Sequence, residues 1–121
     1  MSRIVYVNGE YVSEESAVIS VFDRGFLMAD AVYEVTSVLD GKLLEFDGHL
    51  KRLKRSLSEL DMQEPDAIND LLEIHRTLVR DNQVDQGGVY LQVTRGVADR
   101  DFLYPENVKS TLVMFLSLIH I

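Results

Sequence analysis

Two turn sequences constrain the fold of this chain more than any other feature. An Asn-Gly pair at 8–9 divides the apolar runs of IVYVNGEYV (4–12), and an Asp-Gly pair at 40–41 divides AVYEVTSVLDGKLLEF (31–46). A type I′ turn needs positive φ at both central residues, which these pairs accommodate. We therefore predict two antiparallel hairpins and a β-structured first third of the chain.

The first arm of the second hairpin has two distinct faces. Successive side chains of a strand point to opposite sides, so the even-numbered residues of 32–38 share one face and the odd-numbered residues of 33–39 share the other. Both faces are largely apolar. This pattern predicts a central strand that is covered on both sides.

A helix is predicted over 47–61. Its leucines recur at a 3-4-3 spacing that makes one apolar stripe, and Asp47 is the expected N-cap. The stripe consists of Leu50, Leu53, Leu57 and Leu60.

A second helix is expected to start near Pro65, which suits a first-turn position, and to run through Val79. His75 lies in its apolar stripe, where we expect a packing histidine. The glycine pair at 87–88 is the expected end of this helical region.

Two further strands are predicted at 89–95 and 110–115, with a loop over 96–107 between them. The order of elements indicates an α+β fold, with a mostly antiparallel sheet and two packed helices.

Composition narrows the function classes. With 121 residues, 46% hydrophobic and 26% charged, the chain fits one globular domain. Its net charge of −8 argues against nucleic acid or an anionic membrane as a main partner.

The chain has no cysteine, which excludes a disulfide framework and a thiolate nucleophile. No metal site is expected, because neither His49 nor His75 has a second ligand at a suitable spacing. The N-terminal residues lack the apolar core of a signal peptide, so we expect a cytoplasmic protein.

Four basic residues follow the start of the first predicted helix, where the helix dipole favours an anion. Arg52 is adjacent to the leucine stripe and is therefore the one best able to reach inward. The alternative is a solvated basic face. The four residues are Lys51, Arg52, Lys54 and Arg55.

A second arginine pair, Arg95 and Arg100, lies at a strand end and in the following loop. Such a pair could bind a carboxylate through forked hydrogen bonds. The alternative is salt bridging to Asp99 or Asp101. Composition and spacing thus indicate an anion-binding domain and no particular reaction.

Three segments carry a family resemblance. They are DRGFLMADAVYEV (23–35), HLKRL (49–53) and VYLQVTRGVADRDFLYPEN (89–107). Together they resemble the N-terminal domain of the fold-type IV pyridoxal-phosphate enzymes, and the likeness, over about residues 3–115, is closest to the D-amino-acid transaminases. Ala29 and Ala31 stand where that family usually has glycines.

The resemblance implies roles for five residues. Arg52 matches the arginine that holds the cofactor phosphate. Tyr33 matches the tyrosine that projects into the substrate pocket, and Val35 lines the wall beside it. Arg100 matches the loop arginine that reaches across the dimer to the substrate α-carboxylate. Phe102 stands where a histidine is common in the D-amino-acid branch, which removes one hydrogen-bond donor from the carboxylate site.

Four other matching residues are expected to be structural. Asp23 and Arg24 are expected to clasp the turn that positions the tyrosine strand. Arg95 and Gly96 match a strand end of the family pattern.

The implied reaction is transamination with pyridoxal 5'-phosphate as cofactor. It moves an amino group between a D-amino acid such as D-alanine and a 2-oxo acid such as 2-oxoglutarate. The alternatives are a branched-chain aminotransferase, an aminodeoxychorismate lyase, or a non-catalytic anion-binding domain.

The resemblance also implies a homodimer when the protein is full length, and an N-terminal domain at 1–115. The lysine that forms the Schiff base would lie in a C-terminal domain absent from these residues, since none of the chain's lysines matches it. We therefore expect no catalytic residue and no activity in these residues alone. The last six residues, LSLIHI (116–121), match one reading frame of a common transposase sequencing adapter, so we expect a non-native tail there.

Overall fold

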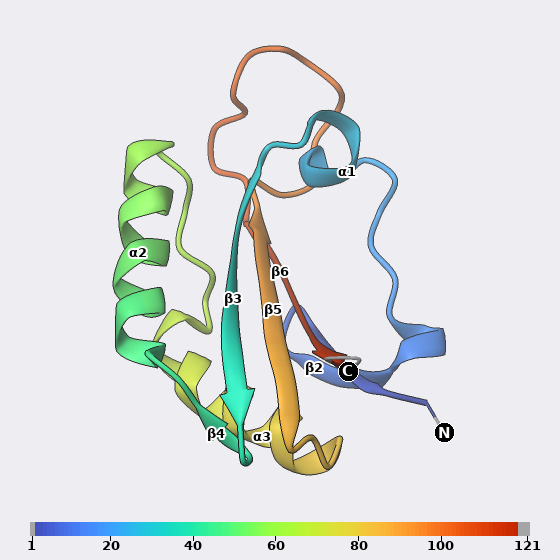
Figure 1. The fold of residues 1–121 in the computed structure, drawn as a ribbon. Coiled ribbons are helices and arrows are strands. Elements are labelled where there is room, and N and C mark those ends of the chain that lie inside the picture. The colour runs from blue at the N-terminus through green and yellow to red at the C-terminus, as the bar shows by residue number, and fades with distance from the viewer. Residues whose placement is uncertain (1, 119–121) are drawn as a thin grey trace.

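The computed structural model describes residues 2–118. They form one six-stranded sheet in the order β2-β1-β6-β5-β3-β4, and every pairing is antiparallel. This confirms the predicted α+β fold with two packed helices (Figure 1). The strands are β1 (Ile4–Val7), β2 (Glu10–Ser13), β3 (Ala31–Leu39), β4 (Lys42–Leu43), β5 (Gln86–Thr94) and β6 (Thr111–Leu118). The helices are η1 (Glu14–Ser16), α1 (Arg24–Met28), α2 (Phe46–Glu59), η2 (Ile68–Asp70) and α3 (Leu71–Asp81).

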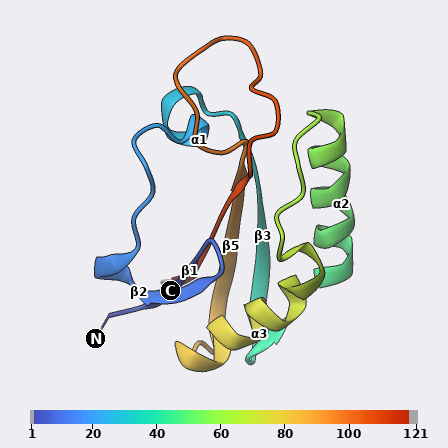
Figure 2. The same cartoon turned by 180° about the vertical axis from the view of Figure 1, so that it is seen from behind.

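The two longer helices, α2 and α3, cover one face of the sheet, whereas residues 14–23 and α1 lie on the other side (Figures 1 and 2). The loop after β5 lies near α1 at the end of the sheet where β3 begins. The core fills the space between the sheet and the two helices, so the helix-facing side of each central strand is apolar. Its fully buried members include Leu53, Leu57, Leu78, Val89 and Met114.

Both predicted two-residue turns are present. Asn8 and Gly9 have φ of 46° and 97°, and Asp40 and Gly41 have φ of 53° and 73°. The left-handed conformation at both central positions is what a tight hairpin with right-twisted strands requires.

The second hairpin has a shorter return arm than predicted. The arm, β4, contains only two residues, because Glu45 adopts a positive φ of 58° and α2 begins immediately after it at Phe46. The assignment of Asp47 as N-cap was therefore wrong. Asp47 lies inside the first turn, and Glu45 occupies the cap position without a side-chain cap bond.

The second predicted helix begins later than expected. Its start near Pro65 was wrong, because a 3-10 turn over 68–70 comes first and α3 begins only at Leu71. The helix continues two residues beyond Val79 and ends at Asp81, where the side chain of Asn82 caps it. Its Nδ2 donates to Leu78 O at 2.8 Å, and its Oδ1 accepts from the backbone N of Ile4 at 2.8 Å. The helix end is thus tied to β1 through a side chain.

The glycine pair at 87–88 does not end the helical region, as was predicted, but lies within β5. Gly88 pairs with Ser37 of β3, and a Cβ on Gly88 would lie 3.2 Å from Val35 Cγ1. The prediction for His75 is confirmed. It is buried, its Nδ1 donates to Leu71 O at 2.6 Å, and burial lowers the pKa of its imidazole.

Strand β6 extends three residues beyond the predicted strand, and its pairing with β5 continues through Leu118. Leu116 is buried in the core. The origin of residues 116–121 stays a prediction, and 119–121 lie outside the described residues.

One face of β3 is open, which contradicts the expectation of a strand covered on both sides. Glu34, Thr36 and Val38 are buried under the helices, whereas Tyr33 and Val35 are 64% and 41% exposed. Among the described residues, only the 14–23 segment and the short helix α1 lie on this side of the sheet, whereas α2 and α3 lie on the other (Figure 2).

Candidate functional site

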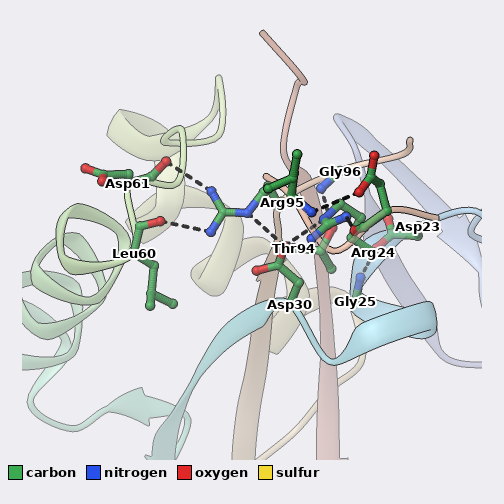
Figure 3. Close-up of polar contacts among 11 residues, drawn as sticks. Asp23, Arg24, Gly25, Asp30, Leu60, Asp61, Thr94, Arg95 and Gly96 are labelled. Carbon is green, nitrogen blue, oxygen red and sulfur yellow. Dashed lines mark hydrogen bonds and ion pairs between the residues drawn. The ribbon is translucent and has the colours of Figure 1, made fainter. Parts of the chain in front are cut away.

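The turn before β3 is built around Asp23. This residue caps α1, and its Oδ1 accepts from the backbone N of Gly25 at 2.8 Å. The backbone N of Arg24 donates to Gly96 O at 2.8 Å, which ties the turn to the end of β5 (Figure 3). These contacts bear out the predicted turn clasp.

Asp30 joins two buried arginines at the start of β3 (Figure 3). Nε of Arg24 and Nε of Arg95 both donate to Oδ2 of Asp30 at 2.8 Å. Burial opposes ionisation of this carboxyl, but the two arginines outweigh burial and lower the pKa of Asp30. The cluster fixes the position of β3 relative to α1 and β5.

Arg95 is structural, as predicted, but its partners differ from the expected ones. Its guanidinium donates to the carbonyls of Leu60 and Asp61 after α2, at 2.9 and 3.1 Å. The alternative of salt bridges to Asp99 or Asp101 was wrong for this arginine, because its acidic partner is Asp30. The residue is therefore fully engaged in holding the fold together.

Ala29 has a left-handed backbone conformation, with φ of 55° and ψ of 30°, at the C-cap of α1. Glycine adopts this conformation without the clash that a Cβ causes. This is a physical reason for glycine to be usual at this position of the family pattern. The structure gives no corresponding reason at Ala31, which begins β3.

Arg52 lies on α2 in a two-pronged contact with Glu34 of β3. Its Nε donates to Oε2 and its Nη2 to Oε1, both at 2.8 Å. His49 Nδ1 lies 2.7 Å from the same Oε1 and donates to it, since an ionised carboxylate only accepts. Burial opposes ionisation of Glu34, but Arg52 and His49 lower its pKa.

The Arg52 side chain remains 58% exposed despite this contact. The N–H groups of Nη1 take no part in the fork. A planar guanidinium carries its donors in a geometry that a phosphate accepts, which is compatible with the predicted role of Arg52.

An aromatic row crosses the open face of the sheet. Tyr33 of β3 stacks on Tyr90 of β5 with ring centroids 5.6 Å apart, and Tyr90 stacks on Phe115 of β6 at 4.9 Å. The Tyr90 hydroxyl donates to Gln92 Oε1 at 3.0 Å. The row places three stacked aromatic rings on this face, and Val35 pairs with the middle one, Tyr90.

Arg100 and Phe102 lie on the exposed loop after β5. The guanidinium carbon of Arg100 is 5.2 Å from the centre of the Phe102 ring, and Phe102 is 79% exposed. The loop is anchored to the clasp, because Nη1 of Arg24 donates to Asp101 O at 2.8 Å.

The predicted site residues thus form two pairs and a separate arginine. Tyr33 and Val35 share one face of β3, and Arg100 and Phe102 share one loop. Among residues 2–118, no hydrogen bond or ion pair connects Arg52 with either pair. The binding roles assigned to these five residues stay predictions.

Sequence reasoning missed four residues of this region: Asp30, Glu34, His49 and Tyr90. Glu34 could have been found, because a carboxylate on the buried face of an otherwise apolar strand needs a cationic partner. The pairing of Tyr90 with Tyr33 has no such local signal, since it depends on the register between β3 and β5.

Residues 2–118 contain no group of three or more His, Asp or Glu side chains arranged to hold a metal ion. None of the helices described is both long and apolar enough to cross a membrane.

Curated proteins share sequence with this chain. D-alanine aminotransferase from Staphylococcus epidermidis (strain ATCC 35984) is 38% identical over 110 residues, which cover 91% of this chain and 39% of that protein. The chain therefore spans about two fifths of the length of the curated relatives it matches.

Solved structures share the fold at lower sequence identity. The branched-chain amino acid aminotransferase from Escherichia coli has a TM-score of 0.89 at 19% identity, covering 98% of this chain and 42% of that chain. The 4-amino-4-deoxychorismate lyase of Pseudomonas aeruginosa has a TM-score of 0.71 at 23% identity, covering 95% and 40%.

A family model described as amino-transferase class IV matches residues 31–121, which include β3, α2 and the arginine-bearing loop. Together with the identity to D-alanine aminotransferases, this match confirms the predicted family. The chain belongs to the class IV aminotransferase family.

Proposed function

We propose that this chain forms the N-terminal domain of a pyridoxal-phosphate-dependent D-amino-acid aminotransferase that transfers an amino group from a D-amino acid such as D-alanine to a 2-oxo acid such as 2-oxoglutarate. The observation that carries the proposal is the likeness to D-alanine aminotransferases, which extends over 91% of the chain. The cofactor, when bound, supplies the electron sink for the α-proton transfer. The full-length protein would act as a cytoplasmic homodimer.

In this proposal Arg52 binds the cofactor phosphate. Its guanidinium is held by the buried carboxylate of Glu34, while the Arg52 side chain as a whole is 58% exposed. Charge-assisted hydrogen bonds to a phosphate would satisfy the remaining N–H donors. Arg52 therefore orients the cofactor and takes no part in proton transfer.

The open face of β3 forms one wall of the substrate site. Tyr33 and Val35 project from it, and a bound amino acid would remove their apolar surface from water. Arg100 binds the substrate α-carboxylate from the loop, and Phe102 packs beside it without offering a hydrogen bond.

Replacement of Arg52 tests the cofactor role. We expect Arg52→Ala in the full-length protein to weaken pyridoxal 5'-phosphate binding at least about tenfold, because charge-assisted hydrogen bonds to the phosphate are lost. Arg55→Ala, on the same helix but paired with the exposed Glu59, is the matched control. Equal cofactor affinity of the two variants would refute the assignment.

Two related activities have an observation in their favour. The branched-chain aminotransferase and lyase structures share this fold, and Phe102 replaces a histidine that is common in the D-amino-acid branch. Parallel assays of the full-length protein on D-alanine, L-leucine and aminodeoxychorismate discriminate among the three. A non-catalytic anion-binding domain would turn over none of them.

A further inference from the structure

We propose that Glu34 is a positioning residue for the cofactor site. Its carboxylate fixes the orientation of the Arg52 guanidinium and ties this arginine to the strand that carries the substrate wall. The inference rests on the proposed function of Arg52 as the phosphate-binding residue, and goes beyond it by assigning Glu34 a role in phosphate recognition.

The contact between the two side chains has the geometry of an orienting clamp. Both carboxylate oxygens of Glu34 accept from Arg52, one from Nε and one from Nη2, at 2.8 Å each. Two parallel hydrogen bonds define the plane of a guanidinium, whereas a single bond leaves it free to rotate. The fork therefore sets the direction in which the remaining donors of Arg52 point.

A second contact holds the carboxylate itself. His49 and Arg52 are three residues apart on α2, so their side chains are neighbours on the helix surface. His49 Nδ1 lies 2.7 Å from the Oε1 that also accepts from Arg52. With its side chain only 7% exposed and held by two residues, Glu34 has little room to move.

A purely structural role does not require this residue type. The neighbouring positions on the same face of β3, Thr36 and Val38, are buried without any charge. Burying a carboxylate is costly unless it is paired, and a well-packed apolar residue is often as stabilising as a buried ion pair. Glu34 also leaves its arginine partner 58% exposed, so a ligand can reach the guanidinium while the carboxylate holds it.

The position of Glu34 in the chain connects the two parts of the site. Its immediate neighbours, Tyr33 and Val35, project from the opposite face of β3. Residues 33–35 therefore serve both parts of the site: Glu34 holds Arg52 on one side of the strand, and its two neighbours form the substrate wall on the other. Preorganising a flexible arginine in this way lowers the entropic cost of binding its ligand.

Glu34→Asp is the decisive variant, because it keeps the negative charge but shortens the side chain, so that the carboxylate no longer reaches both donors. The probes are pyridoxamine 5'-phosphate and pyridoxamine, which differ only in the phosphate. For the full-length protein, calorimetry gives both dissociation constants and hence the preference for the phosphorylated probe. We expect E34D to reduce this preference about three- to tenfold, with little change in pyridoxamine binding.

Glu34→Gln separates position from charge. It keeps the size of the side chain but places an NH₂ against the arginine donors, so we expect it to reduce the preference as well. If Glu34 acted only through its charge, E34D would match the wild type, and E34Q would bind the phosphate more tightly because a nearby negative charge is gone. That pair of results would overturn the proposal.

Glu59→Gln is the matched control, because Glu59 lies on α2 in an exposed pair with Arg55. We expect E59Q to leave the preference for the phosphorylated probe unchanged. Melting temperatures verify that the variants fold, and if E34D does not fold, E34Q decides alone. A loss of the same size in E59Q would overturn the positioning role.

A double-mutant cycle with Arg52→Ala separates the role of Glu34 from the role of Arg52. If Glu34 acts through Arg52, adding E34D to R52A causes no further loss of preference. Additive losses would overturn the positioning role alone. An unchanged preference in R52A itself would refute the proposed function of Arg52, and the inference with it.

Discussion

At the scale of single residues, Ala29 is in a backbone conformation that suits glycine better. Its φ of 55° costs an L-residue with a Cβ about 1–2 kcal/mol. We expect Ala29→Gly to raise the free energy of unfolding by about 0.5–1 kcal/mol, because the relief exceeds the added entropy of the unfolded chain. Urea denaturation measures the change. Ala31→Gly, at the start of β3, is the control and should destabilise the protein.

The carboxylate of Asp30 is the counter-charge of two buried arginines, so its loss is expected to be severe. We expect Asp30→Asn to lower the free energy of unfolding by about 3 kcal/mol at neutral pH, since it leaves Arg24 and Arg95 without that counter-charge. Urea denaturation of both proteins tests this, with Asp85→Asn at an exposed position as control.

The same substitution has a predictable pH dependence. Because the folded-state pKa of Asp30 is below its unfolded value, the contribution of its charge is complete above about pH 4 and is lost as the pH falls through the lowered pKa. The difference in stability between the wild type and D30N should therefore shrink in acid. A difference that stays constant down to about pH 2 would show that the charge of Asp30 contributes nothing.

At the scale of elements, α1 is joined to β5 through a glycine contact. A Cβ on Gly25 would lie 2.4 Å from Thr94 Cγ2, so α1 packs on the strand end at a distance only glycine allows. We expect Gly25→Ala to cost about 1–3 kcal/mol of stability. Gly48→Ala is a matched control, because Gly48 lies in α2 facing open space and alanine favours a helix. A stable G25A protein would contradict the packing described.

How far the elements follow from sequence depends on the range of the interactions that define them. The turns at 8–9 and 40–41 were predictable because their signal is local and geometric. The short β4 and the early start of α2 were not predictable. They depend on the positive φ of Glu45, and a positive φ at a glutamate has no signal in the sequence. The glycine pair at 87–88 suggested a break, but pairing with β3 makes it part of a strand.

The candidate site shows the same limit. Its residue types and approximate places could be predicted from motifs, because Arg52, Tyr33 and Arg100 belong to recognisable segments. The partners of those residues could not, because Glu34 lies eighteen residues from Arg52 in sequence and meets it only when α2 packs on β3. Likewise, Asp30 meets Arg95 across sixty-five residues.

At the scale of the whole molecule, the sheet divides the domain into a packed side and an open side. On the packed side, α2 and α3 cover the hydrophobic core. The aromatic row of Tyr33, Tyr90 and Phe115 lies on the open side. In the proposed full-length protein, this open side forms the substrate wall. We expect a bound amino-acid analogue to protect Tyr33 from chemical modification there, a change that amino-acid-specific labelling with mass spectrometry would measure.

The proposed activity is tested most directly by an enantiomer-resolved assay with 2-oxoglutarate and pyridoxal 5'-phosphate. The full-length protein should convert D-alanine to pyruvate and leave L-alanine unchanged, and the 121-residue chain alone should form no pyruvate from either. Turnover of L-leucine or aminodeoxychorismate without turnover of D-alanine, or turnover of D-alanine by the 121-residue chain alone, would contradict this account.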